Sequence, residues 1–294
     1  MDVGSWLIET RTLIDRWIQE DFPPNASTGG TVEEVMRYSL LAGGKRLRPQ
    51  LVLASAAYLG HVVEEFKEMA LAVEYLHTYS LIHDDLPAMD NDDWRRGSPT
   101  AHKQFGEAMA ILAGDALLTE AFVKMAGPGL AARFEPSRLV AAIGNFSHAV
   151  GRQGLIQGQV KDLAGEGQTL QLQQLAEIHH KKTGALIIAC VQMPAMVVGD
   201  FVSEARLIEY GSHFGLAFQI VDDILNETGD AAMMGKSTGT DRALGKATYP
   251  ALLGMDESRR LADYHRIQAK TALGWEPRAE LLQGLIDFAV DRQW

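Results

Sequence analysis

Cysteine is nearly absent from this chain of 294 residues, which contains only Cys190. A single cysteine cannot form a disulfide within the chain, and its apolar surroundings in residues 186–191 favour a buried core position. The N-terminus lacks the basic, apolar and small-residue pattern of a secretion signal, and no apolar stretch reaches the ~20 residues that span a bilayer. We therefore expect a cytoplasmic protein without a membrane span.

Positive charge is also scarce, because 27 Lys and Arg residues face 38 Asp and Glu residues and the formal net charge is −11. Nucleic-acid-binding proteins usually present a basic surface, so we expect no nucleic-acid partner. The same negative field repels anionic substrates, so recognition of one requires local basic groups. Such groups occur at residues 45–48, 95–96 and 181–182 and at Lys236 and Lys246.

Runs that alternate polar and apolar residues, as strands do, are missing. Apolar residues instead recur at three- and four-residue spacing, which predicts helices over ~4–19, ~31–42, ~47–59, ~62–86, ~104–126, ~136–151, ~171–198, ~203–226, ~256–272 and ~277–291. Residues 108–118 and 185–198 are apolar on most faces, which predicts helices buried centrally. The Gly- and Pro-rich breaks are too short for interdomain linkers. We expect one all-α domain over residues 1–294.

Carboxylates gather in two segments with apolar flanks. Residues 80–97 contain Asp84, Asp85 and Asp90, and residues 218–226 contain Asp222 and Asp223. Carboxylates packed this densely repel one another, and a cation relieves the repulsion. Oxygen ligands select Mg²⁺, which is usually held by one or two carboxylates together with substrate phosphate oxygens. One such run alone reads equally well as a solvated helix end, but two favour a phosphate-handling metal site.

Helix geometry refines both segments. Pro87 predicts a helix end or bend that lets Asp90 fold back towards Asp84 and Asp85. In the second segment, helical spacing places Asp222 and Asn226 on one face, with Gln219 one turn earlier.

Several motifs, in this order along the chain, resemble those of the short-chain trans-prenyl diphosphate synthases, most closely the bacterial farnesyl diphosphate synthases (geranyltranstransferases). They are residues 43–49 (GGKRLRP), 84–96 (DDLPAMDNDDWRR), 158–163 (GQVKDL), 182–184 (KTG), 218–223 (FQIVDD) and 245–250 (GKATYP). The resemblance implies an all-helical, single-domain bundle around a deep central cavity, in a homodimer, with the acidic segments facing each other across its mouth.

The resemblance also implies a reaction in which an allylic diphosphate ionises and isopentenyl diphosphate attacks the carbocation. Dimethylallyl and geranyl diphosphate would be the allylic substrates, and farnesyl diphosphate the main product. It implies about three Mg²⁺ ions per site, stabilising the leaving diphosphate. The implied metal ligands are Asp84, Asp85, Asp90, Asp222 and Asp223. The implied catalytic residues are Asp84, Asp85, Asp90, Arg95, Lys182, Thr183, Gln219 and Lys246.

The substrate-binding residues follow from the same resemblance. Arg95, Lys182 and Lys246, with Lys236 as a further candidate, match the clamps on the allylic diphosphate, and Thr183 and Gln219 match the groups beside the carbocation. Gly44, Lys45, Arg48, His77 and Arg96 match the isopentenyl diphosphate site. By itself His77 reads as a packed helix histidine. Tyr79, beside Thr78, takes the position that limits product length, and an aromatic floor there favours a C15 product.

Some residues depart from the family pattern and leave alternatives open. Asn226 stands where the second motif usually ends in Asp, which predicts weaker metal binding. Val221 and Gln157 also differ from many relatives. A C20 synthase is the nearest rival and a low-activity subunit of a heteromeric synthase a further one, whereas residues 43–49 and Arg96 argue against a terpene cyclase. Residues 229–245 read as a loop that closes over the diphosphates.

Overall fold

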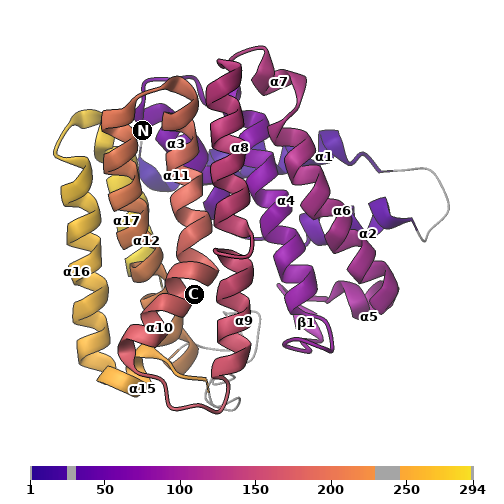
Figure 1. Cartoon of the computed structure of the whole chain (residues 1–294), viewed down its shortest axis with the longest axis vertical. Helices are drawn as coiled ribbons and strands as arrows, with labels where there is room; N and C mark the ends of the chain where they lie inside the picture. Colours follow the sequence, from indigo (N-terminus) through magenta and orange to yellow (C-terminus); the bar gives the residue numbers. More distant parts are fainter. Residues whose placement is uncertain (1, 25–30, 229–245, 293–294) are drawn as a thin grey trace. The chain divides into compact units, whose positions relative to one another are not determined.

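The computed structural model describes residues 2–24, 31–228 and 246–292. The chain forms two compact units. Unit 1 comprises residues 1–53 and 63–133, and unit 2 comprises residues 54–62 and 134–294. Both are built from helices (Figure 1). Helix α3 (Leu47–Tyr58) contributes its first residues to unit 1 and its last to unit 2.

Unit 1 is organised around a central helix. Helix α4 packs against α1, α2 and α6, and twelve of its residues are buried. The tyrosine hydroxyl in its buried face is satisfied, because Tyr75 Oη donates to Asp21 Oδ2 over 2.6 Å. The elements of this unit besides α3 are α1 (Val3–Asp21), α2 (Val32–Leu41), η1 (Val63–Phe66), α4 (Lys67–Asp84), β1 (Trp94–Arg95), β2 (Ser98–Pro99), α5 (Ala101–Phe105), α6 (Glu107–Met125) and α7 (Pro128–Ala131).

Unit 2 is a helical bundle in which α12 packs against α11 and α16, and α16 against α17 (Figure 1). A π-helical turn, η2, joins α10 to α11, and α9 packs against this turn. The elements are α8 (Pro136–Val150), α9 (Leu155–Gly165), α10 (Leu172–His179), η2 (His180–Gly184), α11 (Ala185–Val198), α12 (Phe201–Thr228), α15 (Tyr249–Leu253), α16 (Met255–Leu273), η3 (Pro277–Ala279) and α17 (Glu280–Asp291).

The predicted all-α class is confirmed, and most predicted helices lie within a few residues of their expected bounds. Helix α9 was not predicted, because Gly158 in its middle disfavours a helix and breaks the apolar period. The prediction over ~104–126 is wrong in one detail, since Gly106 (φ +86°) separates α5 from α6. Central burial was predicted for residues 108–118 and 185–198. Helix α11 is largely buried, whereas α6 exposes Ile111 and Leu112.

One helical stretch, Leu172–Val198, has the length and apolar composition of a membrane-crossing helix, although the sequence led us to expect none. Its most apolar window is 61% buried within the structure. Such burial is typical of the core helix of a globular fold, and Cys190 lies buried within it.

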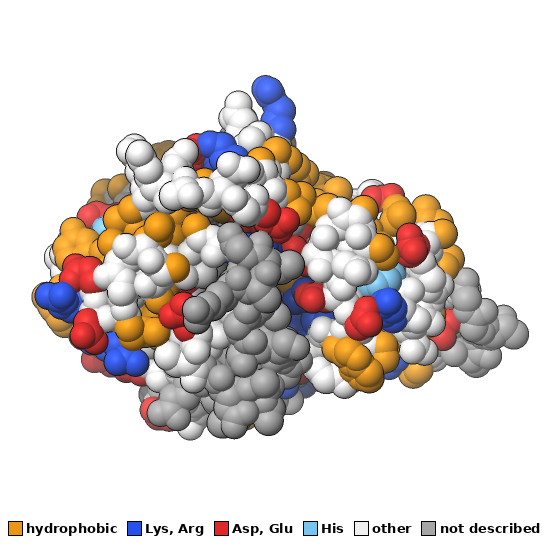
Figure 2. Space-filling view, turned by 90° about the horizontal axis from the view of Figure 1, so that it is seen from below, with side chains coloured by type: hydrophobic (Ala, Val, Ile, Leu, Met, Phe, Trp, Pro, Cys, Tyr) orange, Lys and Arg blue, Asp and Glu red, His pale blue; other side chains and the backbone are white. Residues whose placement is uncertain are grey.

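Charged side chains of both signs are interspersed on the face shown in Figure 2, where the described Lys and Arg residues form no continuous basic surface. The absence of a nucleic-acid partner, expected from the net charge of −11, stays a prediction.

Two histidines meet between α12 and α16, where His213 Nδ1 and His265 Nδ1 lie 2.8 Å apart. Burial and the neighbouring His213 lower the pKa of His265 to about 4. The unfolded chain, with a histidine pKa near ~6.5, takes up a proton first as the pH falls. We therefore expect His265 to cost no stability above about pH 6.5 and to destabilise the fold by about 1–2 kcal/mol near pH 4.5, after allowance for its partial exposure.

Urea unfolding at pH 7.5 and 4.5 measures this effect. His265→Gln should reduce the loss of stability at the lower pH, whereas His148→Gln, at an exposed histidine of α8, should leave it unchanged. An equal pH dependence in wild-type protein and His265→Gln would contradict the prediction.

Candidate active site

The first acidic segment lies at the C-terminal end of α4, which stops at Asp84. Beyond Pro87 the chain turns back, and the Asp90 amide donates to the Asp84 carbonyl over 2.9 Å. The predicted return of Asp90 towards Asp84 is therefore confirmed. A proline that cannot continue the helix and a tight turn place three carboxylates within one short stretch of unit 1.

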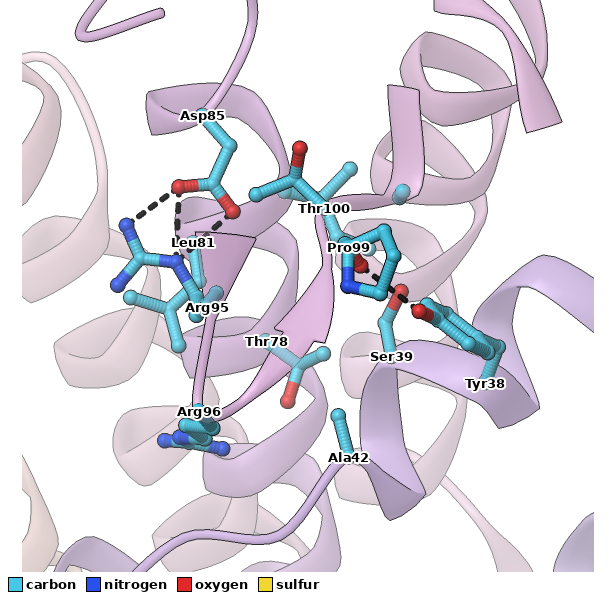
Figure 3. Close-up of a pocket in the computed structure, with 12 residues that line it drawn as sticks. Tyr38, Ser39, Ala42, Thr78, Leu81, Asp85, Arg95, Arg96, Pro99 and Thr100 are labelled. Atoms are coloured by element: carbon cyan, nitrogen blue, oxygen red, sulfur yellow. Dashed lines mark hydrogen bonds and ion pairs between the residues drawn. The ribbon is translucent and has the colours of Figure 1, made fainter. Parts of the chain in front are cut away.

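Asp85 accepts a bidentate interaction from Arg95, whose Nε lies 2.8 Å from both carboxylate oxygens (Figure 3). Burial raises the pKa of the Asp85 carboxyl, Arg95 lowers it, and the carboxylates of Asp92 and Asp90 raise it further. Burial is the largest cause, so the net shift of the pKa is upwards although Arg95 opposes it. A further cation nearby would favour the charged form of Asp85.

Arg95 and Arg96 are held on a two-residue hairpin in which β1 pairs antiparallel with β2. Its turn consists of Arg96 (φ +53°) and Gly97 (φ +79°), a conformation that favours glycine at the second position. Consecutive residues therefore point in different directions: Arg95 reaches Asp85, whereas Arg96 donates to the Gly43 carbonyl. Gly44 has φ +132°, a conformation that favours glycine, and a Cβ there would lie 2.6 Å from the Arg96 guanidinium and displace it.

The basic group at residues 45–48 divides into a structural and an accessible part. Arg46 is 3% exposed and pairs with Asp15 over 2.8 Å and with Glu74 over 2.5 Å, which anchors the glycine loop to α1 and α4. Lys45 and Arg48 are only partly buried. Arg48 Nη1 lies 3.3 Å from His77 Nε2, and burial together with four arginines lowers the pKa of His77 well below its usual value. His77 is therefore a neutral acceptor beside Arg48.

A small cavity of about 30 Å³ lies between α2, α4 and the hairpin, and Asp85, Arg95 and Arg96 are among its lining residues (Figure 3). This volume suits one or two water molecules. The Thr78 hydroxyl lines the cavity and has no hydrogen-bond partner among the described residues. Tyr79, one residue on, points to another side of α4, where its ring meets His83 at 5.2 Å. The two residues proposed for product length thus occupy different surroundings.

In unit 2, the π-helical turn presents Lys182 and Thr183. π-Helical turns are rare and often lie at functional sites. A Cβ on Gly158 would lie 2.2 Å from the Lys182 backbone nitrogen, so only glycine lets α9 approach this turn. The approach brings Asp162 of α9 within 2.6 Å of Lys182 Nζ. Lys246 Nζ lies 3.9 Å from Asp162, so the two predicted clamp lysines share one carboxylate.

A chain of hydrogen bonds joins Thr183 to the second acidic segment. Thr183 Oγ1 donates to Gln219 Oε1 over 3.0 Å, and Gln219 Nε2 donates to Asp223 Oδ1 over 3.1 Å. Asp223 is 4% exposed, and its other oxygen accepts from the Tyr249 amide over 3.0 Å. Asp223 therefore fixes the carboxamide of Gln219 and is itself held by the start of α15.

Asp222 is the more accessible carboxylate of this segment, with a side chain 42% exposed, whereas Asn226 is 5% exposed. In the structure, Asp222 Oδ1 accepts from Arg292 Nη2 over 2.6 Å. Lys236 and the expected lid over 229–245 lie outside the described residues.

The donor set suits magnesium more than a transition metal. Within the described ranges, no group of three or more His, Cys, Asp or Glu side chains is arranged to hold an ion by itself. Asp84, Asp85 and Asp90 nevertheless offer hard oxygen donors within one short turn. Such donors fit Mg²⁺ that completes its coordination with water and substrate oxygens.

The structure places three further residues beside the predicted site residues, and the sequence had assigned no role to them. They are Asp162, His179 and Arg292. Asp162 belongs to a quoted motif, and its position four residues after Gly158 on α9 was a usable signal. His179 lies three residues before Lys182, and its Nε2 is 3.9 Å from Asp223 Oδ2. Arg292 follows an ordinary amphipathic helix, and only tertiary structure brings it to Asp222.

The fold and these groups define an all-helical protein in which carboxylates and basic side chains are held close together. The polyprenyl synthetase family model matches residues 30–274, which include parts of both units. The chain therefore belongs to the polyprenyl synthetase family.

Individual relatives agree. A dimethylallyltranstransferase of Fischerella ambigua is 50% identical, over 87% of this chain and 75% of that protein. The farnesyl diphosphate synthase of Escherichia coli is 45% identical, over 89% of each chain. A geranylgeranyl pyrophosphate synthase of Arabidopsis thaliana is likewise 45% identical, over 83% of this chain and 69% of that protein. Relatives named for products of different length thus have similar identity.

Among solved structures, a geranyltransferase of Helicobacter pylori in complex with magnesium and isoprenyl diphosphate matches with a TM-score of 0.83 and 32% identity. The match covers 99% of this chain and 97% of that one.

Proposed function

We propose that the chain catalyses the head-to-tail condensation of isopentenyl diphosphate with dimethylallyl and geranyl diphosphate and forms mainly farnesyl diphosphate. Family membership and the names of the relatives support the reaction class. The observation that carries the proposal for this chain is the turn after α4, where Asp90 folds back on Asp84 beside Asp85 and Arg95. The carboxylate oxygens gathered in this turn suit a Mg²⁺ ion that also binds diphosphate.

We assign the leaving diphosphate to the residues that match the family's motifs. Asp84, Asp85 and Asp90 would hold Mg²⁺, which as a Lewis acid stabilises the charge that develops on the departing oxygen. Asp222 would contribute from α12 because it is half-exposed, and Asp223 would add the remaining lone pairs of a carboxylate already held by Gln219 and the Tyr249 amide. About three ions per site remain our expectation by analogy with the family. Arg95, Lys182 and Lys246 would neutralise the non-bridging oxygens.

The remaining polar groups suit the second substrate and the carbocation. Gly44, Lys45, Arg48, His77 and Arg96 would bind isopentenyl diphosphate without metal. Burial lowers the pKa of Arg96 to about 10, and nearby arginines contribute to this shift, so an incoming anion is favoured here. Thr183 and Gln219, linked by a hydrogen bond, would offer oxygen dipoles but no nucleophile to the cation. The departed diphosphate would accept the proton.

Incubation of purified protein with Mg²⁺, isopentenyl diphosphate and either dimethylallyl or geranyl diphosphate, followed by chain-length analysis, tests this function. We expect a dominant C15 product from both. A dominant C20 product would establish the geranylgeranyl alternative. No product, with activity regained only on adding a second prenyl synthase subunit, would establish the heteromeric one.

Product length depends, in our proposal, on Tyr79. Its side chain is 7% exposed, and the ring packs edge-on against His83. Because Tyr79→Ala removes the aromatic ring, we expect the product ratio to shift from C15 to C20 by about tenfold or more, which corresponds to at least ~1.4 kcal/mol in relative barriers.

Thr78, the second residue assigned to product length, lines a cavity together with Asp85, whereas Tyr79 packs against His83. Because of these different surroundings we expect Thr78→Ala to keep a C15 product, and this variant is compared with Tyr79→Ala. If Thr78→Ala lengthened the product as Tyr79→Ala does, blocking by Tyr79 alone would be excluded.

We further propose a homodimer that uses α6. This helix has large apolar side chains that would be exposed to solvent in a monomer. Ile111, Leu112 and Val123 are 43%, 54% and 54% exposed. Leu112→Glu should therefore convert a dimer to a monomer in size-exclusion chromatography with light scattering, whereas Val62→Glu, another exposed apolar position, should not. A monomeric wild-type protein would contradict the proposal.

We also propose a cytoplasmic location. A single domain over residues 1–294 is a further proposal, because the family model extends into both units.

A further inference from the structure

Arg292 follows the last helix, α17, and its side chain turns back onto α12. One nitrogen, Nη2, donates to the Phe218 carbonyl over 2.8 Å and to Asp222 Oδ1 over 2.6 Å. The guanidinium carbon lies 3.8 Å from the centroid of the Phe218 ring. These three contacts tie the C-terminal end of the chain to the α12 turn that carries the second acidic segment.

The pair is unequal in burial. The Arg292 side chain is 5% exposed and the Asp222 side chain 42%. Arg292 Nε is also buried without a hydrogen-bond partner among the described residues. A buried guanidinium depends on its counter-ion, because an unpaired buried charge is costly. Asp222, by contrast, retains water on one side and can accept a second cation there.

The Arg292–Asp222 ion pair matters because few carboxylates on this part of α12 can bind a cation. The α12 segment offers two carboxylates, Asp222 and Asp223, because residue 226 is Asn. Asp223 is 4% exposed whereas the Asp222 side chain is 42% exposed, so Asp222 is the carboxylate open to a cation from solvent. Arg292 already supplies that carboxylate with a positive charge.

We propose that Arg292 is a built-in competitor of the divalent cation at Asp222. The inference rests on the proposed function, because it concerns the same metal. In the substrate-free protein Arg292 neutralises Asp222 and keeps the C-terminal end docked. Binding of a divalent ion at Asp222 places like charges close together, so it is weakened by Arg292 and loosens the C-terminal end. Arg292 is thus a positioning residue that makes metal binding at the second segment depend on the additional charge of a bound diphosphate.

Direct metal binding to the substrate-free protein tests this, with Mn²⁺ as the probe and electron paramagnetic resonance as the readout. Arg292→Gln should bind Mn²⁺ about tenfold more tightly than wild type, because a unit charge about 5 Å from a divalent ion is removed at a half-exposed site. The gain should disappear when Asp222→Asn is added. Arg292→Lys, which keeps the charge, should stay within about twofold of wild type.

Arg266→Gln is the matched control. Arg266 also holds the C-terminal end, through Asp291 over 3.1 Å, but does not contact Asp222. It should leave Mn²⁺ affinity unchanged. Equal affinity in wild type, Arg292→Gln and Arg266→Gln would overturn the proposal, and so would equal tightening in both variants, since that would indicate a general loosening of the C-terminus.

A second readout covers the case in which Arg292→Gln does not fold. Hydrogen exchange of residues 286–292 in the wild-type protein should accelerate when Mn²⁺ and inorganic diphosphate are added, and unchanged exchange despite bound metal would overturn the proposal. Neither measurement uses turnover. Absence of product with both allylic substrates would refute the proposed function and leave these binding results interpretable.

Discussion

Replacing Asp84 by Asn should lower kcat/KM for the condensation by at least about 10³-fold, or ~4 kcal/mol in transition-state stabilisation. The change removes one negative charge from the turn in which Asp84 and Asp90 are joined by a backbone hydrogen bond, while the Asp85–Arg95 pair is kept. Because metal-stabilised departure of diphosphate is the step that needs this charge, kcat should fall more than the affinity for isopentenyl diphosphate. Steady-state kinetics with geranyl diphosphate at saturating Mg²⁺ measures the effect.

Asp93→Asn is the matched control, because Asp93 lies in the same acidic segment but pairs with Lys103 at the surface over 2.8 Å. It removes the same charge and should change kcat/KM less than about threefold. Similar losses in both variants would mean that the segment acts only through its total charge, and full activity in Asp84→Asn would exclude the assigned role.

Arg46→Met should lower the free energy of unfolding by about 3–5 kcal/mol. The substitution leaves Glu74, whose side chain is 2% exposed, as an unpaired buried carboxylate, and it also removes the bond to Asp15. Urea denaturation followed by circular dichroism at pH 7.5 measures the change.

Two further variants separate charge burial from loss of a side chain. Arg16→Met breaks an exposed pair with Glu20 at 3.9 Å and should cost less than about 0.5 kcal/mol. The double variant Arg46→Met with Glu74→Met should recover part of the lost stability, because no uncompensated charge remains. A loss for Arg46→Met as small as for Arg16→Met would show that the buried pair is not needed.

The two acidic segments illustrate how far sequence reasoning extends. Pro87 was enough to predict that Asp90 returns to Asp84, because a proline restricts the backbone locally whatever surrounds it. Helical spacing likewise placed Gln219 one turn before Asp222 and Asp223. It did not indicate that Asp223 would be buried under Tyr249 and Asp222 half-exposed, because burial depends on α15 and α17 packing against α12.

The basic residues at 45–48 likewise show what the sequence could predict and what it could not. Residues 45–48 were recognisable as a cationic group, but Arg46 serves the core whereas Lys45 and Arg48 remain partly exposed. The difference arises from positive backbone angles at Gly43, Gly44 and Arg46, and from partners 28 and 31 residues away in sequence. Neighbours in sequence are therefore poor guides to the direction of a side chain in a glycine loop.

By itself the sequence determined the all-α class, most helices and the family, because apolar periodicity and ordered motifs are local properties of the chain. Tertiary structure decided which charges are compensated. It brought Lys182 and Lys246 to Asp162, turned Thr78 and Tyr79 into different surroundings, and placed Arg292 on Asp222 across 70 residues of sequence. Pairings of this kind depend on helix packing, since side chains that are distant in sequence meet only when their helices share a face.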